Sequence, residues 1–166
     1  MVDLGLKRYS RPPACGGRKK RGDEAALNQQ ALGRSRGGFS TKLHVSVNGL
    51  GLPVELKLTP GQSADITEAE ALLQDYEFEA AIGDKGFDSK KLIDYIESRG
   101  AQAVIPPRSN LKDQRAFDRH LYKERNLVER FINRIKHYRR VATRYEKTAR
   151  NFLAFVQLAA IMVLLV

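Results

Sequence analysis

The sequence is poor in cysteine and lacks tryptophan. It contains one cysteine, Cys15, and no tryptophan among its 166 residues. A single cysteine excludes a disulfide within the chain and any zinc module built from several thiolates. Basic residues near the start lead into Pro12-Pro13 rather than into an apolar run, so no signal peptide is predicted. These absences favour a reducing cytoplasm as the location.

No apolar run is long enough to span a bilayer. The longest, residues 152–166, is interrupted only by Gln157 and has fifteen residues, whereas a spanning helix needs about 20. A buried core helix is therefore predicted there, with a membrane segment as the alternative, and no membrane partner is expected. With 42% apolar and 29% charged residues, the chain has the composition of one globular domain.

Acidic residues are scarce outside the middle of the chain. Residues 1–43 carry ten basic and three acidic side chains, residues 44–107 carry five and eleven, and residues 108–150 carry fourteen and five. Basic flanks suit the phosphates of a nucleic acid, and acidic residues between them suit a metal ion. A solvated basic surface explains the net charge of +10 equally well, so charge alone does not decide the function.

Order is predicted over residues 39–166, after an irregular basic segment over residues 1–38. Apolar and polar residues alternate over residues 43–47 and again over 54–58, around the turn signal Asn48-Gly49. This pattern predicts a hairpin whose strands each bury one face.

Helix and strand signals alternate after the hairpin. Helices are predicted after Asp65, which can cap the first of them, and again between Ser89 and Gly100. Short buried strands are predicted at residues 79–82 and 103–105. This order implies an α/β fold with flanking helices and a mixed sheet, antiparallel at the hairpin and parallel afterwards.

Asp84 is the first candidate for chemistry. It follows a predicted strand and lies in the turn Gly83-Asp84-Lys85-Gly86-Phe87-Asp88. Functional side chains gather at strand ends of sheets with parallel pairs, and glycines let a phosphate approach the backbone. The alternative is that Asp84 only caps a turn.

A second set of candidates lies in the helix predicted from Gln114 onward. Four residues spaced by 3, 4 and 7 share one face of that helix: Tyr122, Arg125, Glu129 and Lys136. A basic row beside them is predicted to bind DNA phosphates: Arg119, Lys123, Arg130 and Arg134. The alternative for Arg125 and Glu129 is an ordinary ion pair between successive helical turns.

These motifs together resemble the catalytic core of DDE transposases of bacterial insertion sequences. The likeness rests on Asp84 in its turn and on the Tyr-x2-Arg-x3-Glu-x6-Lys signature between Tyr122 and Lys136. Residues 33–44 and 139–145 also resemble that family. The resemblance implies a fold like that of ribonuclease H.

The resemblance also implies DNA transposition by metal-dependent cleavage and strand transfer at insertion-sequence ends. Three carboxylates would hold two Mg²⁺ ions, for which Mn²⁺ can substitute, and the ions would activate a water or a 3′-hydroxyl. Asp84 matches the family's second acidic residue and Glu129 the third. Tyr122, Arg125 and Lys136 match residues that position phosphates, and element-end and target DNA are the implied partners.

The family's first acidic residue has a single candidate, Asp3. Only Met1 and Val2 precede it, which is too few for a strand ending at Asp3, so the first strand of the sheet is predicted to be missing. The unusual run from Leu4 to Cys15 suggests a shifted reading frame. The chain is therefore predicted to be a C-terminal or second-frame part of a transposase that cuts no DNA alone. Its further partners would be the upstream reading-frame product or intact transposase subunits.

Two other functions stay open at this point. In one, the chain is a catalytically inactive DNA-binding remnant, or an inhibitor that joins intact transposase. In the other, it is a basic RNA-binding protein with no nuclease ancestry. The order of strands in the sheet separates this last alternative from a transposase.

Overall fold

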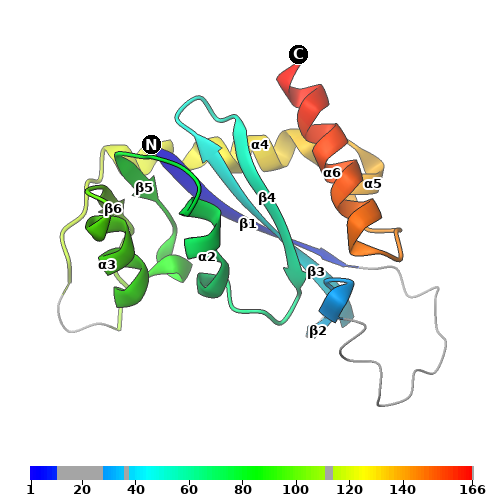
Figure 1. Ribbon diagram of the computed structural model, residues 1–166, viewed down its shortest axis with the longest axis horizontal. Helices are drawn as coiled ribbons and strands as arrows, with labels where there is room; N and C mark the ends of the chain where they lie inside the picture. The colour runs from blue at the N-terminus through cyan, green and yellow to red at the C-terminus, as the bar shows by residue number, and fades with distance from the viewer. Residues whose placement is uncertain (11–27, 36–37, 111–113, 166) are drawn as a thin grey trace. The chain divides into compact units, whose positions relative to one another are not determined.

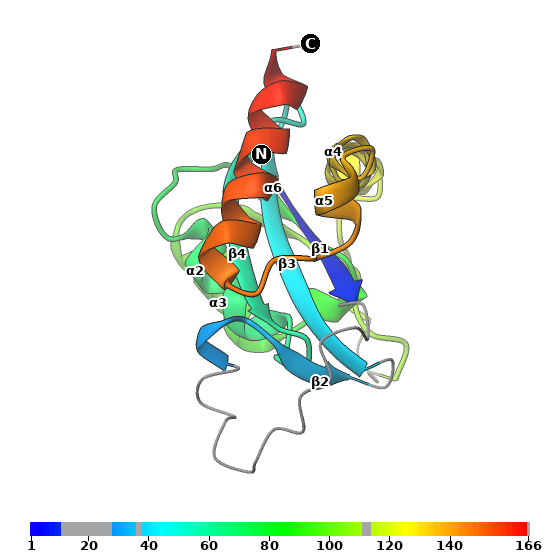
Figure 2. The same cartoon turned by 90° about the vertical axis from the view of Figure 1, so that its right-hand side faces the viewer.

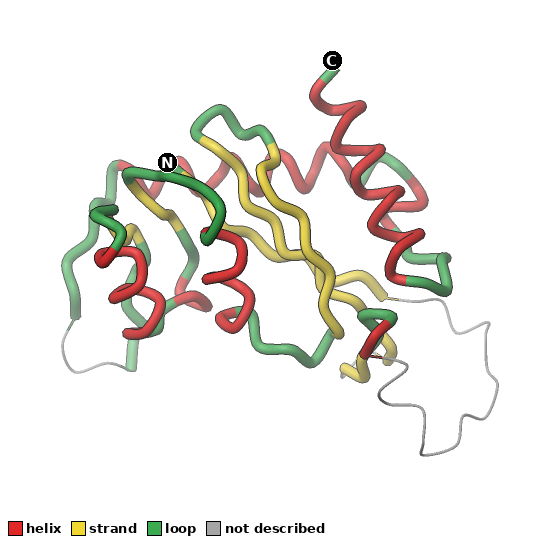
Figure 3. Tube along the Cα trace, viewed as in Figure 1, coloured by secondary structure: helices red, strands yellow, loops and turns green. Residues whose placement is uncertain are grey.

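The computed structural model describes residues 1–10, 28–35, 38–110 and 114–165, with only the backbone described over residues 6–10 and at Ser35. The chain divides into two compact units, which are described in turn. The first unit comprises Met1–Gly5, His44–Glu55 and Ala64–Phe131, and the second comprises Leu6–Leu43, Leu56–Ser63 and Ile132–Val166. Figure 3 shows how helices and strands alternate along the described chain.

The described strands form one mixed sheet. Along the sheet the order is β2-β3-β1-β5-β6, and β4 also pairs with β3. The pairs β1–β5 and β5–β6 are parallel and β2–β3 is antiparallel, which confirms the predicted α/β fold with a mixed sheet. The strands are β1 (Val2–Ser10), β2 (Gly33–Ser35), β3 (Gly38–Asn48), β4 (Pro53–Pro60), β5 (Ala80–Ile82) and β6 (Gln102–Val104).

The prediction of a missing first strand is wrong. Strand β1 pairs with β5 in parallel, with Val2 opposite Ala81 and Asp3 opposite Ile82. Asp3 was expected at the end of a strand, whereas it lies near the beginning of β1, so few preceding residues are needed. The irregular segment predicted over residues 1–38 is accordingly wrong at β1, and residues 11–27 lie outside the described residues.

The hairpin of β3 and β4 confirms the predicted strands but not their turn or their exposure. Residues 49–52 form a loop in which Gly51 has φ +77°, and the Asn48 side chain accepts hydrogen bonds from Leu50 and Leu52. A two-residue turn therefore does not form. Strand β3 is also buried along both faces over residues 40–47, rather than along one, as is usual for an interior strand.

The first unit packs helices against one face of its strands. Helices α2 (Ile66–Leu73) and α3 (Lys90–Ser98) contact each other (Figure 1). Asp65 is the N-cap residue of α2, as predicted, but its side chain makes no capping hydrogen bond to the helix. The core on this side contains these buried residues: Val2, Leu4, Ala69, Leu72, Leu73, Ala81, Phe87, Leu92 and Ile96.

The helix predicted from Gln114 begins later than expected. The 3-10 helix η2 (Leu121–Arg125) leads directly into α4 (Asn126–Ile135). Asp118 sets this start, because its Oδ1 accepts hydrogen bonds from the backbone N–H groups of His120 at 2.8 Å and Leu121 at 3.0 Å. Residues 114–120 are consequently not helical.

The second unit contains the β2–β3 pairing (Figure 2) and two C-terminal helices, α5 (Arg139–Ala142) and α6 (Ala149–Leu164). Thr148 caps α6 by accepting a hydrogen bond from the Asn151 N–H. One face of α6 is buried through Phe152, Val156, Ala159 and Ala160, while Leu158, Ile161 and Met162 are exposed. The predicted core helix is therefore buried on one face only.

No helix in the described part of the chain is long and apolar enough to cross a membrane.

Candidate active site

The Asp3 and Asp84 side chains lie on the same face of the sheet, on or just after two neighbouring strands. Asp3 lies opposite Ile82 in the parallel β1–β5 pair, and Asp84 follows Ile82 by two residues. The backbone at Asp84 is still extended, with φ −77° and ψ 176°. Because alternate residues of an extended chain share a face, Asp84 projects from the face on which Asp3 lies.

The η2–α4 segment covers that face within the first unit. Ile82 packs in a cluster with Leu121 and Tyr122 of η2. On β1, a Cβ added to Gly5 would overlap the Val128 side chain, so glycine lets α4 approach the strand closely. The Val128 N–H donates to Asp3 Oδ2 at 3.1 Å, and this bond joins Asp3 to the first turn of α4.

Asp3 is a buried acid with only part of its hydrogen-bonding capacity used. Its side chain has no solvent exposure, and Oδ1 has no hydrogen-bond partner among the described residues. Burial raises the pKa of Asp3 to about 8, with a further increase from the Glu129 charge, while the Val128 N–H and Arg125 lower it. Asp3 is therefore largely protonated at neutral pH when no cation is close.

Arg125 and Glu129 form the ion pair that the alternative interpretation predicted. Arg125 Nη1 lies 2.7 Å from Glu129 Oε1, and the Arg125 guanidinium lies 5.8 Å from the centre of the Tyr122 ring. Partial burial alone would lower the pKa of Arg125, but the Glu129 carboxylate raises it on balance. The Glu129 side chain is 54% exposed, so the carboxylate is paired and still open to solvent.

Asp84 is exposed and caps its turn, as its alternative interpretation also predicted. Its Oδ1 accepts a hydrogen bond from the Gly86 N–H at 2.7 Å at the start of the short helix η1 (Lys85–Phe87). A Cβ on Gly86 would lie only 2.8 Å from that oxygen, so glycine is needed for this turn. The cap holds the carboxyl in a defined orientation.

The predicted phosphate-binding residues do not lie on one continuous helix. Arg119 is in the turn before η2, Lys123 is in η2 and Arg130 is on α4, and all three are exposed. Because η2 has 3-10 geometry, the spacing of 100° per residue does not hold across it. The remaining two, Arg134 on α4 and Lys136 after it, belong to the second unit, and Lys136 Nζ donates to Asn133.

The donor set has the chemistry that a hard divalent cation prefers. Mg²⁺ and Mn²⁺ bind carboxylate oxygens, and the unpartnered Oδ1 of Asp3 is an oxygen that a cation would satisfy. Within the described residues, however, no three His, Cys, Asp or Glu side chains are close enough together to hold a metal ion. The carboxyl oxygens therefore suit a divalent cation in their chemistry, although the described residues do not bring three such ligands together.

Sequence reasoning missed the close contact of Gly5 with Val128, which joins β1 to α4. A glycine two residues after an acidic strand residue is the signal that could have found it. Sequence reasoning also missed the contacts of Asp88, whose carboxylate is bound by the Arg108 backbone N–H and by Arg115.

An open mixed sheet with flanking helices is compatible with a ribonuclease H-like fold. Residues 13–164 match the transposase DDE domain family, so the chain belongs to this family, which acts on DNA, depends on divalent metal ions and carries out DNA transposition. The predicted resemblance is thereby confirmed. The match begins after Asp3. The family match therefore does not test the assignment of Asp3 as a site residue.

A Brucella ovis protein named as a transposase for insertion sequence element IS6501 is similar to this chain. It is 39% identical over 127 residues, which cover 75% of this chain and 98% of that protein. Comparison with solved structures gives no match.

Proposed function

We propose that this chain cleaves DNA and transfers strands at the ends of an insertion sequence, with Asp3, Asp84 and Glu129 as its metal ligands. One observation supports this proposal most. Asp3 lies opposite Ile82 on the strand beside Asp84 and accepts a hydrogen bond from Val128, the residue before Glu129. Residues far apart in the sequence thus converge on one face of the sheet.

Each carboxylate would have a distinct part in holding the cation. Asp3 would use Oδ1, because Oδ2 already accepts the Val128 N–H. Glu129 is oriented by its ion pair with Arg125, and Asp84 is oriented by the Gly86 N–H. When bound, Mg²⁺ or Mn²⁺ supplies activation of a water or 3′-hydroxyl and stabilises the leaving oxygen.

The prediction that the chain cuts no DNA alone depended on a missing first strand. Strand β1 removes that reason. We therefore propose that the described residues themselves provide all three carboxylates, and that an upstream reading-frame product or a second transposase subunit adds DNA contacts rather than a missing ligand.

The test uses the purified chain with DNA that carries an insertion-sequence end, in Mg²⁺ or Mn²⁺. Cleavage is expected, with loss of roughly a hundredfold to a thousandfold in Asp84→Asn and in Glu129→Gln, since electrostatic stabilisation of that size is typical. Asp94→Asn is the matched control, because Asp94 is an exposed carboxylate on α3, which packs on the other face.

Two results would overturn the proposal. One is cleavage that survives Asp84→Asn. The other is DNA binding without cleavage in either metal, even when the upstream frame is fused in register, which would favour the inactive remnant or the inhibitor.

We also propose that Tyr122, Arg125 and Lys136 contact element-end phosphates, and that the exposed basic residues bind DNA without sequence preference: Arg119, Lys123, Arg130 and Arg134. Each phosphate contact releases counterions, so each substitution by glutamine should reduce the slope of log affinity against log salt by about one. Lys91→Gln on α3 is the matched control. Unchanged slopes in all four variants would exclude this surface.

A further inference from the structure

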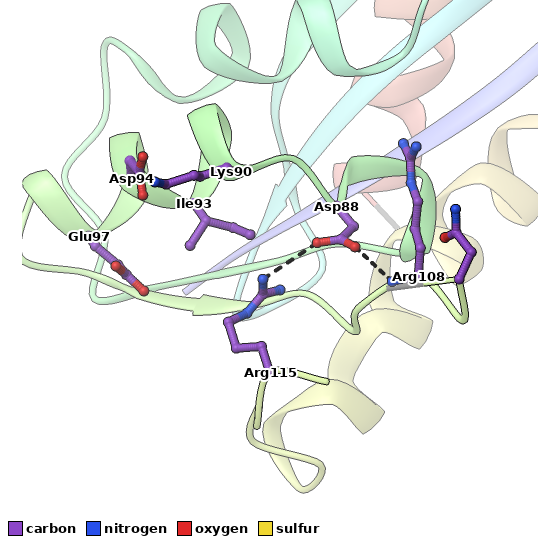
Figure 4. Close-up of a pocket in the computed structure, with 8 residues that line it drawn as sticks. Asp88, Lys90, Ile93, Asp94, Glu97, Arg108 and Arg115 are labelled. Carbon is purple, nitrogen blue, oxygen red and sulfur yellow. Dashed lines mark hydrogen bonds and ion pairs between the residues drawn. The ribbon is translucent and has the colours of Figure 1, made fainter. Parts of the chain in front are cut away.

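Asp88 is a nearly buried carboxylate at the end of the turn that carries Asp84. It is 8% exposed. Its Oδ2 accepts the Arg108 backbone N–H at 2.7 Å, and its Oδ1 lies 3.5 Å from Arg115 Nη1 (Figure 4). Both oxygens are thus bound by the segment that connects β6 to η2.

The same segment holds the other side of the turn. The Arg108 guanidinium donates to the carbonyl oxygens of Lys85 and Gly86, each at 3.4 Å. Gly86 is also the residue whose N–H binds Asp84 Oδ1. Arg108 therefore contacts the peptide units that orient the Asp84 carboxyl.

Arg115 links this arrangement to the sheet and lies shortly before the helical segment. Its Nη2 donates to the Ile105 carbonyl at 2.6 Å, just after β6. Two residues later, Phe117 packs edge-on against Tyr122 of η2, with 5.4 Å between ring centres. The segment that binds Asp88 is therefore also the one that packs under Tyr122.

A cavity of about 470 Å³ adjoins Asp88, Arg108 and Arg115. Acidic and basic side chains line it in equal number, and Lys90, Asp94 and Glu97 all come from α3. This balance favours no class of ligand. The Asp88 contacts on the cavity wall are more informative than the cavity itself, because they hold the turn that carries Asp84.

We propose that Asp88, Arg108 and Arg115 form a clamp that positions the Asp84 carboxyl for metal binding. Asp88 is a positioning residue, because it acts through the Gly83–Phe87 turn and not by touching the cation. The inference rests on the proposed function, since it assumes that Asp84 is a metal ligand. Groups that orient a metal ligand typically change metal affinity by 10–100-fold when they are removed.

The test compares Asp88→Asn with Asp94→Asn, which removes the same charge from another residue lining the cavity. Hydrogen exchange of the peptide covering residues 84–88 should be about tenfold faster in Asp88→Asn, and exchange in α3 should be unchanged. The Mn²⁺ concentration for half-saturation, measured by electron paramagnetic resonance, should rise about tenfold. At saturating Mn²⁺ the maximal cleavage rate should remain within about twofold of wild type, because Asp84 itself is intact.

A second variant keeps the proposal testable if Asp88→Asn does not fold. Arg115→Gln removes the charged partner of Asp88, and the Arg115 side chain is 32% exposed. This variant should reproduce both the faster hydrogen exchange and the weaker Mn²⁺ binding. The double variant should lower the Mn²⁺ affinity by less than the two single effects combined, since both single variants remove the Asp88–Arg115 contact. Arg115→Lys, which keeps the charge, should restore part of the Mn²⁺ affinity.

The outcomes separate this inference from the proposed function. Wild-type exchange and wild-type Mn²⁺ affinity in both Asp88→Asn and Arg115→Gln would overturn the clamp while leaving the metal site intact. A wild-type chain that binds no Mn²⁺ would overturn the proposed function, and the positioning role with it, whatever the exchange rates show.

Discussion

Two buried ionisable residues, one in each compact unit, differ in how far their hydrogen-bonding groups are satisfied. Asp3 and Arg144 both have no exposed surface. Asp3 has a hydrogen bond to one oxygen and none among the described residues to the other. Arg144 donates to the carbonyls of Gln30, Ala31, Glu146 and Lys147 and to the Thr41 hydroxyl, and lies over the Phe152 ring.

The difference between them separates a structural ionisable group from a functional one. A buried charge costs little stability only when its hydrogen-bonding groups are satisfied. Arg144 is satisfied by protein atoms, so its task is to hold segments of the second unit together. Asp3 has one carboxyl oxygen without a hydrogen-bond partner among the described residues. A cation bound on the face that Asp3 shares with Asp84 would satisfy this oxygen.

The largest expected effect is on Arg144. Arg144→Ala removes the donor to several buried acceptors at once and should lower the free energy of unfolding by about 3–5 kcal/mol. Arg150→Ala, which changes an exposed arginine on α6, should alter it by less than about 0.5 kcal/mol. Urea denaturation measures both variants, and equal effects would break the comparison.

Asp3 should make stability depend on pH in an unusual direction. Its folded pKa of about 8 lies above the ordinary value of 3.8, so the folded state holds the proton more tightly than the unfolded state. Stability from this group is then greatest at low pH and falls as pH rises from about 4 to about 8. Relative to Asp3→Asn, the wild type should lose up to about 1.4 kcal/mol per pH unit in that window.

Denaturation midpoints at several pH values test this slope, with Asp94→Asn as the variant that should keep it. Saturating Mg²⁺ should flatten the wild-type profile, because cation binding favours the ionised carboxylate. Parallel profiles for wild type and Asp3→Asn would contradict the buried, incomplete state of this acid.

Gly5→Ala should separate β1 from α4. The new methyl group would overlap Val128, whose N–H binds Asp3, and overpacking of this kind costs about 1–3 kcal/mol. Gly49→Ala is the control, because its Cβ would make only an ordinary contact with Met1 at 3.6 Å. Thermal unfolding should distinguish the two, and a harmless Gly5→Ala would show that α4 does not approach β1 this closely.

The smallest effects concern the neighbours of Asp3. Glu129 raises and Arg125 lowers the pKa of Asp3, so Glu129→Gln should lower that pKa and Arg125→Gln should raise it. Both partners are partly exposed, and loss of their ion pair should change stability by less than about 1 kcal/mol. Carbon-13 titration of the Asp3 carboxyl measures the shifts, and shifts of the same sign would contradict the arrangement.

Local patterns made much of the secondary structure predictable. The hairpin strands and the helices α2 and α3 follow alternation and helical spacing that neighbouring residues determine. Asp84, Tyr122 and Glu129 could be found because the motif preserves their spacing. The late start of the helical segment was not predicted, although Asp118 caps it by accepting hydrogen bonds from the His120 and Leu121 N–H groups.

The burial of Asp3 and Arg144 could not be predicted in this way. Strand β1 forms because Val2 and Asp3 pair with Ala81 and Ile82, and pairing across such a sequence distance leaves no local pattern. Arg144 lies in an arginine-rich segment that has the composition of a solvated surface, and its acceptors Gln30 and Ala31 are distant in the chain. Burial of either residue depends on the assembled fold.

Mn²⁺ binding tests the central claim that Asp3, a buried acid with one unpartnered oxygen among the described residues, is a metal ligand. Electron paramagnetic resonance would be used to titrate Mn²⁺ into the wild-type chain and into Asp3→Asn, Asp84→Asn, Glu129→Gln and the control Asp94→Asn, without DNA. The account predicts that wild type and Asp94→Asn bind alike and that each of the other three variants binds at least about tenfold more weakly. Wild-type affinity in Asp3→Asn would contradict it, because Asp3 would then be a buried acid with no part in the metal site.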